Sequence, residues 1–320
     1  MRAYIIRRLV LIIPTLLIVT LLVFFSVRFI PGSVIDLMVS EMAEQSSVGQ
    51  QISPEYIRHA LGLDVPVYIQ YLRWLGGAVH GDFGVSLWKG TSVAEEMLVR
   101  YPVSIELGFL SGIIGLIVSL PVGVYSAIRQ DTFLDYAGRT FAILGLSVPS
   151  FWIATMVVVY PSIWWGWTPS VEYIPFAKNP AGNLLQFGIP AVILGVSMSA
   201  GIMRMTRTMM LEVMRQDFIR TAWAKGLPER MVVMRHAVKN AMIPIITIVG
   251  PMILLLIGGS VIMEQIFCLP GLGRLFLDAL NSRDYPMIQA MNTITATAVL
   301  VVILLVDLTY AYLDPRIVYR

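Results

Sequence analysis

The distribution of charged residues divides the chain into long apolar runs and shorter polar segments. Six runs of 19 or more residues contain no Asp, Glu, Lys or Arg. A helix of about 20 residues is about 30 Å long, which matches the hydrocarbon layer of a bilayer. The pattern therefore predicts an all-α, polytopic membrane protein with six transmembrane helices. The runs are Leu9–Val27, Leu107–Ile128, Thr140–Val171, Asn179–Met203, Asn240–Met263 and Tyr285–Val306.

The composition of the chain narrows the class further. Of its 320 residues, 57% are apolar and only 13% are charged, whereas a soluble domain has about 25% charged residues. So few charges exclude a soluble enzyme. The single cysteine, Cys268, excludes a secreted scaffold held by internal disulfides. The net charge of +3 is too small to indicate a nucleic-acid partner.

The basic residues predict the orientation of the chain, because Lys and Arg next to membrane spans stay in the cytoplasm. With the N-terminus inside and six crossings, the cytoplasmic segments contain 15 of the 23 Lys and Arg residues. Both termini are then cytoplasmic. Residues 1–30 form an N-terminal cytoplasmic tip and the first transmembrane helix, residues 31–102 form an extracytoplasmic loop, and residues 103–320 form a core of five transmembrane helices.

The extracytoplasmic loop is acidic, with eight Asp and Glu residues against four Lys and Arg residues. Within it, Ser53-Pro54-Glu55 predicts a helix start, because a hydroxyl caps the helix and proline suits its first position. A helix is also predicted over Val67–Val79, where apolar residues recur at the helical spacing.

The cytoplasmic segment 204–239 has eight basic and three acidic residues. Asp217–Lys225 predicts a helix with Phe218, Ala222 and Trp223 on one side, and Gly226 predicts its end. Pro228 and Glu229 suit the first turn of a second, short helix, which Asn240 would end before the fifth span. The segment therefore predicts two short helices that project into the cytoplasm and could dock on a partner.

At this segment the chain resembles a known family. RTAWAKGLPERMVVMRHAVKNAMIPI (Arg220–Ile245) is similar to the EAA loop of bacterial ABC-importer permeases, and most similar to the dipeptide/oligopeptide branch. Other stretches resemble that branch as well: RRLVLIIPTLLIVTLLVF near the start, Ala60–Leu87, Phe267–Ala290 and Leu313–Ile317. The Glu-Ala-Ala of the general consensus is replaced by Arg-Thr-Ala at 220–222, and its final proline is displaced to Pro244. These departures favour the peptide-type branch.

The resemblance implies a type I ABC-importer transmembrane fold and a coupling helix around Gly226–Arg230 that seats in a cytoplasmic ATPase. It also implies a second homologous permease subunit, two ATP-binding subunits that bind ATP and Mg, and an extracytoplasmic substrate-binding protein. This protein would dock on the Pro31–Pro102 and Phe267–Pro286 loops. The residues implied in ATPase coupling are Arg220, Thr221, Ala222, Lys225, Gly226, Leu227, Pro228, Glu229 and Arg230.

The chain lacks the motifs that would make it an enzyme. It has no Gly-Lys dipeptide and so no phosphate-binding GxxxxGK[ST] loop, which places ATP hydrolysis on a separate subunit. Its three histidines have no metal-binding spacing, so neither a metal nor another cofactor is expected on this chain. Glu106, Glu264 and Asp307 lie at the edges of apolar runs, which argues against an ion-coupled carrier.

The predicted function is that of a permease subunit that moves di- or oligopeptides across the prokaryotic plasma (inner) membrane in an ATP-driven importer. Two alternatives stay open: the same importer type for an oligosaccharide, nickel or glutathione, and an ATP-independent secondary transporter. Small, polar and aromatic residues near two proline-interrupted spans are candidates for the substrate path: Ser147, Pro149, Ser150, Trp152, Ser197 and Ser199.

Overall fold

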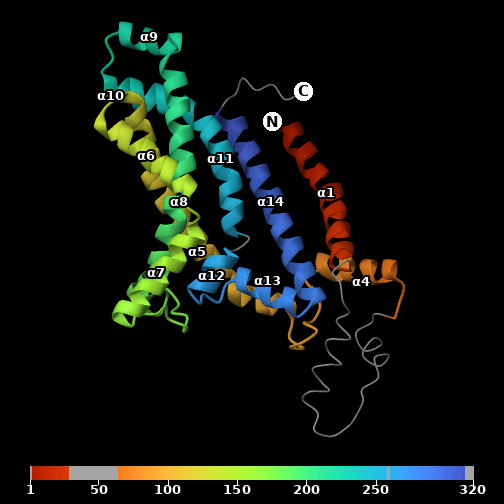
Figure 1. Cartoon of the computed structure of the whole chain (residues 1–320). Helices are drawn as coiled ribbons and strands as arrows, with labels where there is room; N and C mark the ends of the chain where they lie inside the picture. The colour runs from red at the N-terminus through yellow and green to blue at the C-terminus, as the bar shows by residue number, and fades with distance from the viewer. Residues whose placement is uncertain (1, 29–63, 258–259, 314–320) are drawn as a thin grey trace. The chain divides into compact units, whose positions relative to one another are not determined.

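The fold was obtained as a computed structural model that describes residues 2–28, 64–257 and 260–313 (Figure 1). Most of these residues are helical, and the described part contains no β-strand beyond an isolated bridge between Val85 and Ser92. The helices are α1 (Arg2–Arg28), α4 (Val67–Val79), α5 (Val93–Ile128), α6 (Phe133–Ser147), α7 (Ser150–Trp165), α8 (Pro180–Met214), α9 (Asp217–Ala224), α10 (Glu229–Met231), the π-helix η1 (Val232–Val238), α11 (Lys239–Ile257), α12 (Val261–Ile266), α13 (Leu272–Asn281) and α14 (Tyr285–Leu313).

Four of the described helices are long and apolar enough to cross a membrane: α1, α5, α8 and α14. The pair α6–α7 makes a fifth candidate if its two helices are counted as one bent span. The helix α11 covers most of the fifth predicted run, up to residues 258–259, which lie outside the described residues. The all-α membrane class is confirmed, whereas the count of six spans stays a prediction.

The third predicted span is not one continuous helix, which corrects the prediction for Thr140–Val171. The helices α6 and α7 meet at an angle of 86° across a break at Val148 and Pro149. Proline has no N–H to donate and disfavours a helical conformation of the residue before it. Val148 accordingly has an extended conformation, with φ −96° and ψ 119°. The proline therefore ends a helix here, where the apolar pattern alone showed no interruption.

The chain divides into two compact units. The first unit consists of residues up to Pro102 together with Gly271–Leu300. Its core is made where the start of α5 packs with α13 and the start of α14, through residues that include Met97, Leu275 and Met287. The predicted helix over Val67–Val79 is confirmed as α4, while the helix start predicted at Ser53-Pro54-Glu55 lies outside the described residues.

The buried Asp284 holds a loop of the first unit in place. Its carboxylate accepts hydrogen bonds from the Ser86 hydroxyl and, at 3.3 Å, from the Leu87 N–H. Next to it, the Trp88 indole donates to the Ser282 carbonyl at 2.6 Å. These contacts tie the loop before α5 to the turn between α13 and α14, so two segments far apart in the sequence form one surface.

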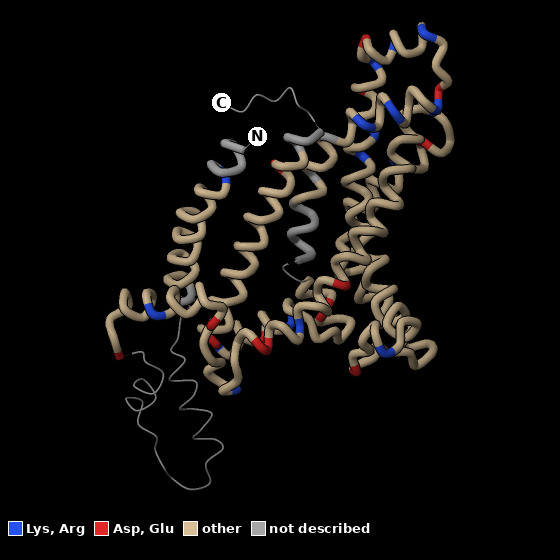
Figure 2. The backbone as a smooth tube through the Cα atoms, turned by 180° about the vertical axis from the view of Figure 1, so that it is seen from behind, with Lys and Arg blue, Asp and Glu red and all other residues tan. Residues whose placement is uncertain are grey.

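The second unit consists of Val103–Pro270 and residues from Val301 onward. Its two apolar cores are centred on α8, whose residues Phe187 and Met210 are fully buried in one core each. The helices α9 and α10 lie at one end of this unit, and α7 and α12 lie at the opposite end (Figure 1). Basic residues gather at the α9–α10 end, while the middle of the long helices has few charges (Figure 2).

Candidate functional site

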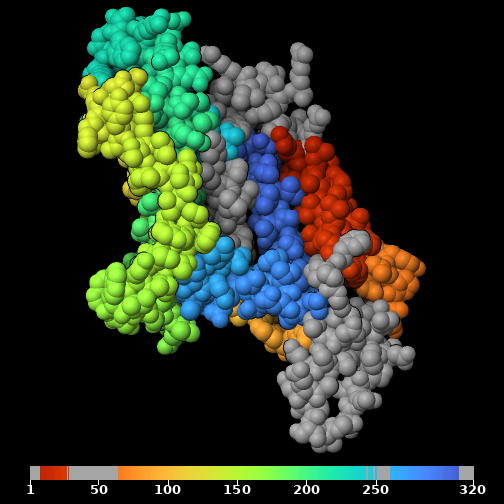
Figure 3. Space-filling view, viewed as in Figure 1, coloured from red at the N-terminus to blue at the C-terminus, as the bar shows by residue number. Residues whose placement is uncertain are grey.

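The segment predicted to couple to an ATPase is a folded part of the second unit. Figure 3 shows α9, in teal, at the surface of one end of this unit, with the start of α6, in yellow, beside it. Beneath this surface, Ile219 of α9 packs with Val232 of η1 and with Met210 of α8, and all three are fully buried. This apolar core fixes the segment to the membrane helices.

The two sides of α9 differ from the prediction. Phe218, Ala222 and Trp223 were expected on one side, but Ala222 is buried beside Ile219, whereas Phe218 and Trp223 are 44% and 43% exposed. The small Ala222 fits against the core, and the two large aromatic residues remain at the surface. Exposed aromatic side chains of this size are typical of protein-binding surfaces.

The end of α9 is a Schellman turn around Gly226. The Gly226 N–H donates to the Trp223 carbonyl at 2.8 Å, and the Leu227 N–H donates to the Ala222 carbonyl at 3.4 Å. Gly226 has φ +76°, a left-handed conformation that glycine adopts without steric cost. Leu227 packs against the same apolar core as Ala222, which completes the hydrophobic contact of this motif. The prediction that Gly226 ends the helix is confirmed.

Pro228 is the N-cap of the next helix, α10, and its carbonyl accepts hydrogen bonds from the N–H groups of Met231 and Val232 at 2.9 and 3.1 Å. Glu229 follows directly and lies 3.5 Å from the guanidinium of Arg129, at the end of α5. Both side chains are more than half exposed, so water screens this ion pair strongly. The contact joins the loop before α6 to the start of α10.

The prediction that Asn240 ends this helix is wrong. The helix continues from α10 through the π-helix η1 into α11, and the Asn240 side chain donates to the His236 carbonyl at 2.6 Å. Lys239, where η1 meets α11, has the helical angles φ −55° and ψ −42°. One continuous helical path therefore leads from the Gly226 turn into α11.

Most of the residues predicted to couple to an ATPase are exposed. Exceptions are Ala222, which is buried, and Leu227, which is partly buried. The exposed members form a mixed basic and apolar surface with the aromatic residues of α9 and with Met231 and Met234, which are 41% and 60% exposed. The exposed predicted residues are Arg220, Thr221, Lys225, Gly226, Pro228, Glu229 and Arg230.

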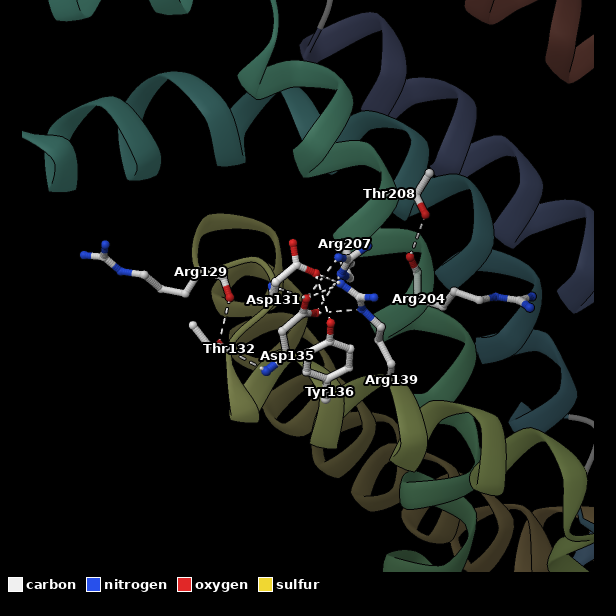
Figure 4. A network of polar contacts seen from close by, with 9 residues as sticks. All are labelled: Arg129, Asp131, Thr132, Asp135, Tyr136, Arg139, Arg204, Arg207 and Thr208. Carbon is white, nitrogen blue, oxygen red and sulfur yellow. Dashed lines mark hydrogen bonds and ion pairs between the residues drawn. The ribbon is translucent and has the colours of Figure 1, made fainter.

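A charged network next to this surface was missed from the sequence (Figure 4). The fully buried Asp135 of α6 pairs with Arg139 one turn later and with Arg207 of α8, whose Nε lies 2.9 Å from the carboxylate. The Thr132 hydroxyl caps α6 by accepting a bond from the Asp135 N–H at 3.4 Å. Two local signals were present: a threonine cap three residues before Asp135, and an Asp–Arg pair with i, i+4 spacing.

The predicted substrate-path residues lie in two places. Ser147, Pro149, Ser150 and Trp152 surround the break between α6 and α7, where Trp152 is 53% exposed. The other two, Ser197 and Ser199, lie on α8.

The two helices approach closely next to these residues. A methyl group added at Gly145 of α6 would lie 2.9 Å from the Ala200 side chain of α8. The Ser199 hydroxyl is buried and donates to the Val196 carbonyl of its own helix at 2.7 Å. A role of the six residues in transport stays a prediction.

Comparison with known families identifies this architecture. The family model described as "Binding-protein-dependent transport system inner membrane component" matches residues 119–319. The chain belongs to this family. A second model, for the N-terminal part of such membrane components, matches residues 1–108. The two matches together cover most of this chain.

Relatives of this membrane component align over their whole length. It is 42% identical to the "Oligopeptide transport system permease protein AppB" of Bacillus subtilis, over 100% of both chains. It is 38% identical to the "Dipeptide transport system permease protein DppB" of Escherichia coli, again over 100% of both chains. A putative peptide transport system permease protein of Brucella suis is 40% identical, with the same coverage.

Solved structures share the fold of the membrane component. A chain of an amino acid ABC transporter with histidines has a TM-score of 0.52 and 14% identity, with 68% of this chain and 94% of that chain covered. A chain of the inward-facing MetNI methionine ABC transporter has a TM-score of 0.50 and 16% identity, with 68% and 96% covered. The predicted type I ABC-importer fold is confirmed by these neighbours.

Proposed function

We propose that this chain is the translocation subunit of an ATP-driven importer of di- or oligopeptides. The observation that carries the proposal is the full-length similarity, at 38–42% identity, to permease proteins of oligopeptide and dipeptide transport systems. The chain itself then has no ATPase activity, because the ATP and Mg are bound by partner subunits.

The surface of α9 and α10 is the proposed contact with an ATP-binding subunit. Its exposed apolar and basic side chains suit a protein partner, and its buried side is fixed to α8. The Gly226 turn starts a continuous helical path into α11, so movement of an ATPase at this turn would tilt a membrane helix. On this proposal the α9–α10 end lies in the cytoplasm, and the distribution of Lys and Arg supports a cytoplasmic N-terminus as well.

The complete importer would contain a second homologous permease subunit, two ATP-binding subunits and an extracytoplasmic substrate-binding protein. The loops before α5 and around α13 are the proposed contacts with the binding protein. Closure of the ATPases opens the path outward, and hydrolysis resets it inward by rigid-body motion of the helices. The polar residues at the α6–α7 break and on α8 are the proposed lining of the path.

Uptake into proteoliposomes tests the substrate class. The complete complex is reconstituted with its binding protein, and accumulation of a labelled dipeptide and pentapeptide is measured with and without ATP inside. We expect uptake of peptide only with ATP. Uptake of an oligosaccharide, nickel or glutathione instead of peptide would contradict the peptide assignment, and equal peptide uptake without ATP would contradict the importer assignment.

A tryptophan pair tests the proposed ATPase contact. Trp223→Ala removes an exposed aromatic side chain from α9, and Trp165→Ala removes one, 74% exposed, from the opposite end of the second unit. Buried interface tryptophans often contribute 2 kcal/mol or more to binding. We expect the α9 variant to lower ATP-dependent uptake about tenfold, and the control to leave uptake unchanged. Equal effects of the two variants would contradict the assignment.

A further inference from the structure

A cavity of about 240 Å³ lies between α6 and α8, next to the charged network. One part of its wall is apolar and is made by Ala142, Ile143, Leu146 and Met203. Ile143 and Leu146 are 64% and 50% exposed, so this wall continues onto the outer surface of α6. Because α8 is a candidate membrane span, the apolar wall suits a hydrocarbon chain.

Three arginines, Arg139, Arg204 and Arg207, also line the cavity. Two of them pair with the carboxylate of Asp135, as described above. The Arg204 side chain extends away from this carboxylate (Figure 4), and it makes no ion pair or hydrogen bond with any described residue. Its side chain is exposed, so its charge is free to attract an anion at the mouth of the cavity.

A buried hydroxyl supplies an independent sign of a ligand. Ser126 of α5 lines the cavity, is only 2% exposed, and its Oγ has no hydrogen-bond partner among the described residues. A buried hydroxyl without a partner is costly, so such groups are normally satisfied by water or a ligand. A methyl group added at Gly138 would lie 3.1 Å from this Oγ, so a side chain at position 138 would crowd the hydroxyl.

We propose that this cavity binds one anionic phospholipid. The phosphate would accept hydrogen bonds from Arg204 and Ser126, and an acyl chain would lie along the apolar wall of α6. Basic pockets between membrane helices are known sites for anionic head groups. A soluble phosphate would satisfy the polar groups but would leave the apolar wall without a partner, so the lipid matches more of the site.

Native mass spectrometry of the purified complex tests the proposal. Detergent-solubilised complex is titrated with phosphatidylglycerol or with phosphatidylcholine of the same acyl chains. We expect one tightly bound phosphatidylglycerol per chain and at least tenfold weaker binding of phosphatidylcholine. Arg204→Gln should weaken phosphatidylglycerol binding about tenfold, the effect of losing one charge-assisted hydrogen bond. Arg215→Gln, at the end of the same helix but outside the cavity, is the matched control.

Any of the following results would overturn the proposal. The first is equal binding of the two lipids, or an equal effect of the two arginine variants. The second is full displacement of the lipid by glycerol phosphate at the same concentration, which would identify a site for a soluble phosphate. The third is retention of the lipid by the Ala142→Phe variant, because the phenylalanine side chain would fill the cavity. If that variant does not assemble, the comparison of the Arg204 and Arg215 variants still tests the proposal.

Discussion

Two proline-containing turns of the second unit differ in how they change the direction of the chain. Between α9 and α10, Gly226 has φ +76° and its neighbours form the hydrogen bonds of a Schellman turn. Between α6 and α7 there is no glycine, and an extended Val148 before Pro149 gives a bend of 86°. The first turn needs a residue that tolerates a left-handed conformation, which is glycine here, whereas the second uses angles that any residue can adopt.

The difference extends to what surrounds each turn. The α9–α10 turn presents exposed apolar and basic side chains outward while its other side is fixed in a core. Most residues around the α6–α7 turn are exposed, and the helix before the turn is held to α8 by the Asp135 network. We infer that the α9–α10 turn serves a protein contact, and that the α6–α7 region depends on its anchor to α8.

The largest expected effect is on the anchor of α6. Asp135→Asn removes the charge that Arg139 and Arg207 share, and it leaves two guanidinium groups without their buried partner. Loss of one member of a buried ion pair costs about 3–5 kcal/mol, and the partial exposure of the arginines reduces this to about 2–3 kcal/mol. The midpoint of thermal unfolding of the purified chain in detergent should fall by several degrees.

Asp131→Asn is the matched control for this variant. Asp131 pairs with Arg139 at 3.4 Å, but its side chain is 74% exposed, so the loss of its charge should not change the unfolding midpoint measurably. If the two substitutions lower the midpoint equally, burial of the Asp135 carboxylate is not what stabilises α6 on α8.

The second effect concerns the glycine of the α9–α10 turn. Gly226→Val forces a β-branched residue into a left-handed conformation, at a cost of about 1–2 kcal/mol, although nothing lies within 4 Å of the added Cβ. We expect peptide uptake per ATP hydrolysed to fall strongly in proteoliposomes. Gly226→Asn should retain most of it, because asparagine tolerates this conformation. Equal activity of both variants would show that the turn geometry does not matter for coupling.

The smallest effect is expected for the ion pair that links the two regions. A double-mutant cycle with Arg129→Gln and Glu229→Gln measures the coupling energy between the loop before α6 and the start of α10. Because both side chains are more than half exposed, the unfolding free energies should give a coupling of about 0.5 kcal/mol or less. A value well above 1 kcal/mol would mean that this contact is a structural link.

Local chemistry explains which parts of the fold the sequence predicts. The helix α4 and the end of α9 follow from helical spacing and from a glycine at a helix end, which are properties of neighbouring residues. The charge-free runs predict the membrane class for the same reason. The two short helices around Gly226 also follow, because a glycine and a nearby proline mark a helix end and a helix start, whereas their role in coupling rests on the family resemblance.

Other features depend on contacts between distant residues. Arg207 meets Asp135 across 72 positions of the chain, and no local pattern specifies that pairing. The buried side of α9 was predicted wrongly, because packing against the core beneath the helix determines that Ile219 and Ala222 are the buried residues. The bend at Pro149 could not be separated from a mild kink, because the surrounding run has no charged residue that marks an end.

Site-specific photo-crosslinking tests the central claim, that the exposed side of α9 contacts an ATP-binding subunit. A benzophenone amino acid is introduced at Trp223 or, as the control, at Trp165, and the assembled complex is irradiated in membranes. We predict a covalent adduct with the ATP-binding subunit from position 223 and none from position 165. A complex that hydrolyses ATP but gives no such adduct from position 223 would contradict the account.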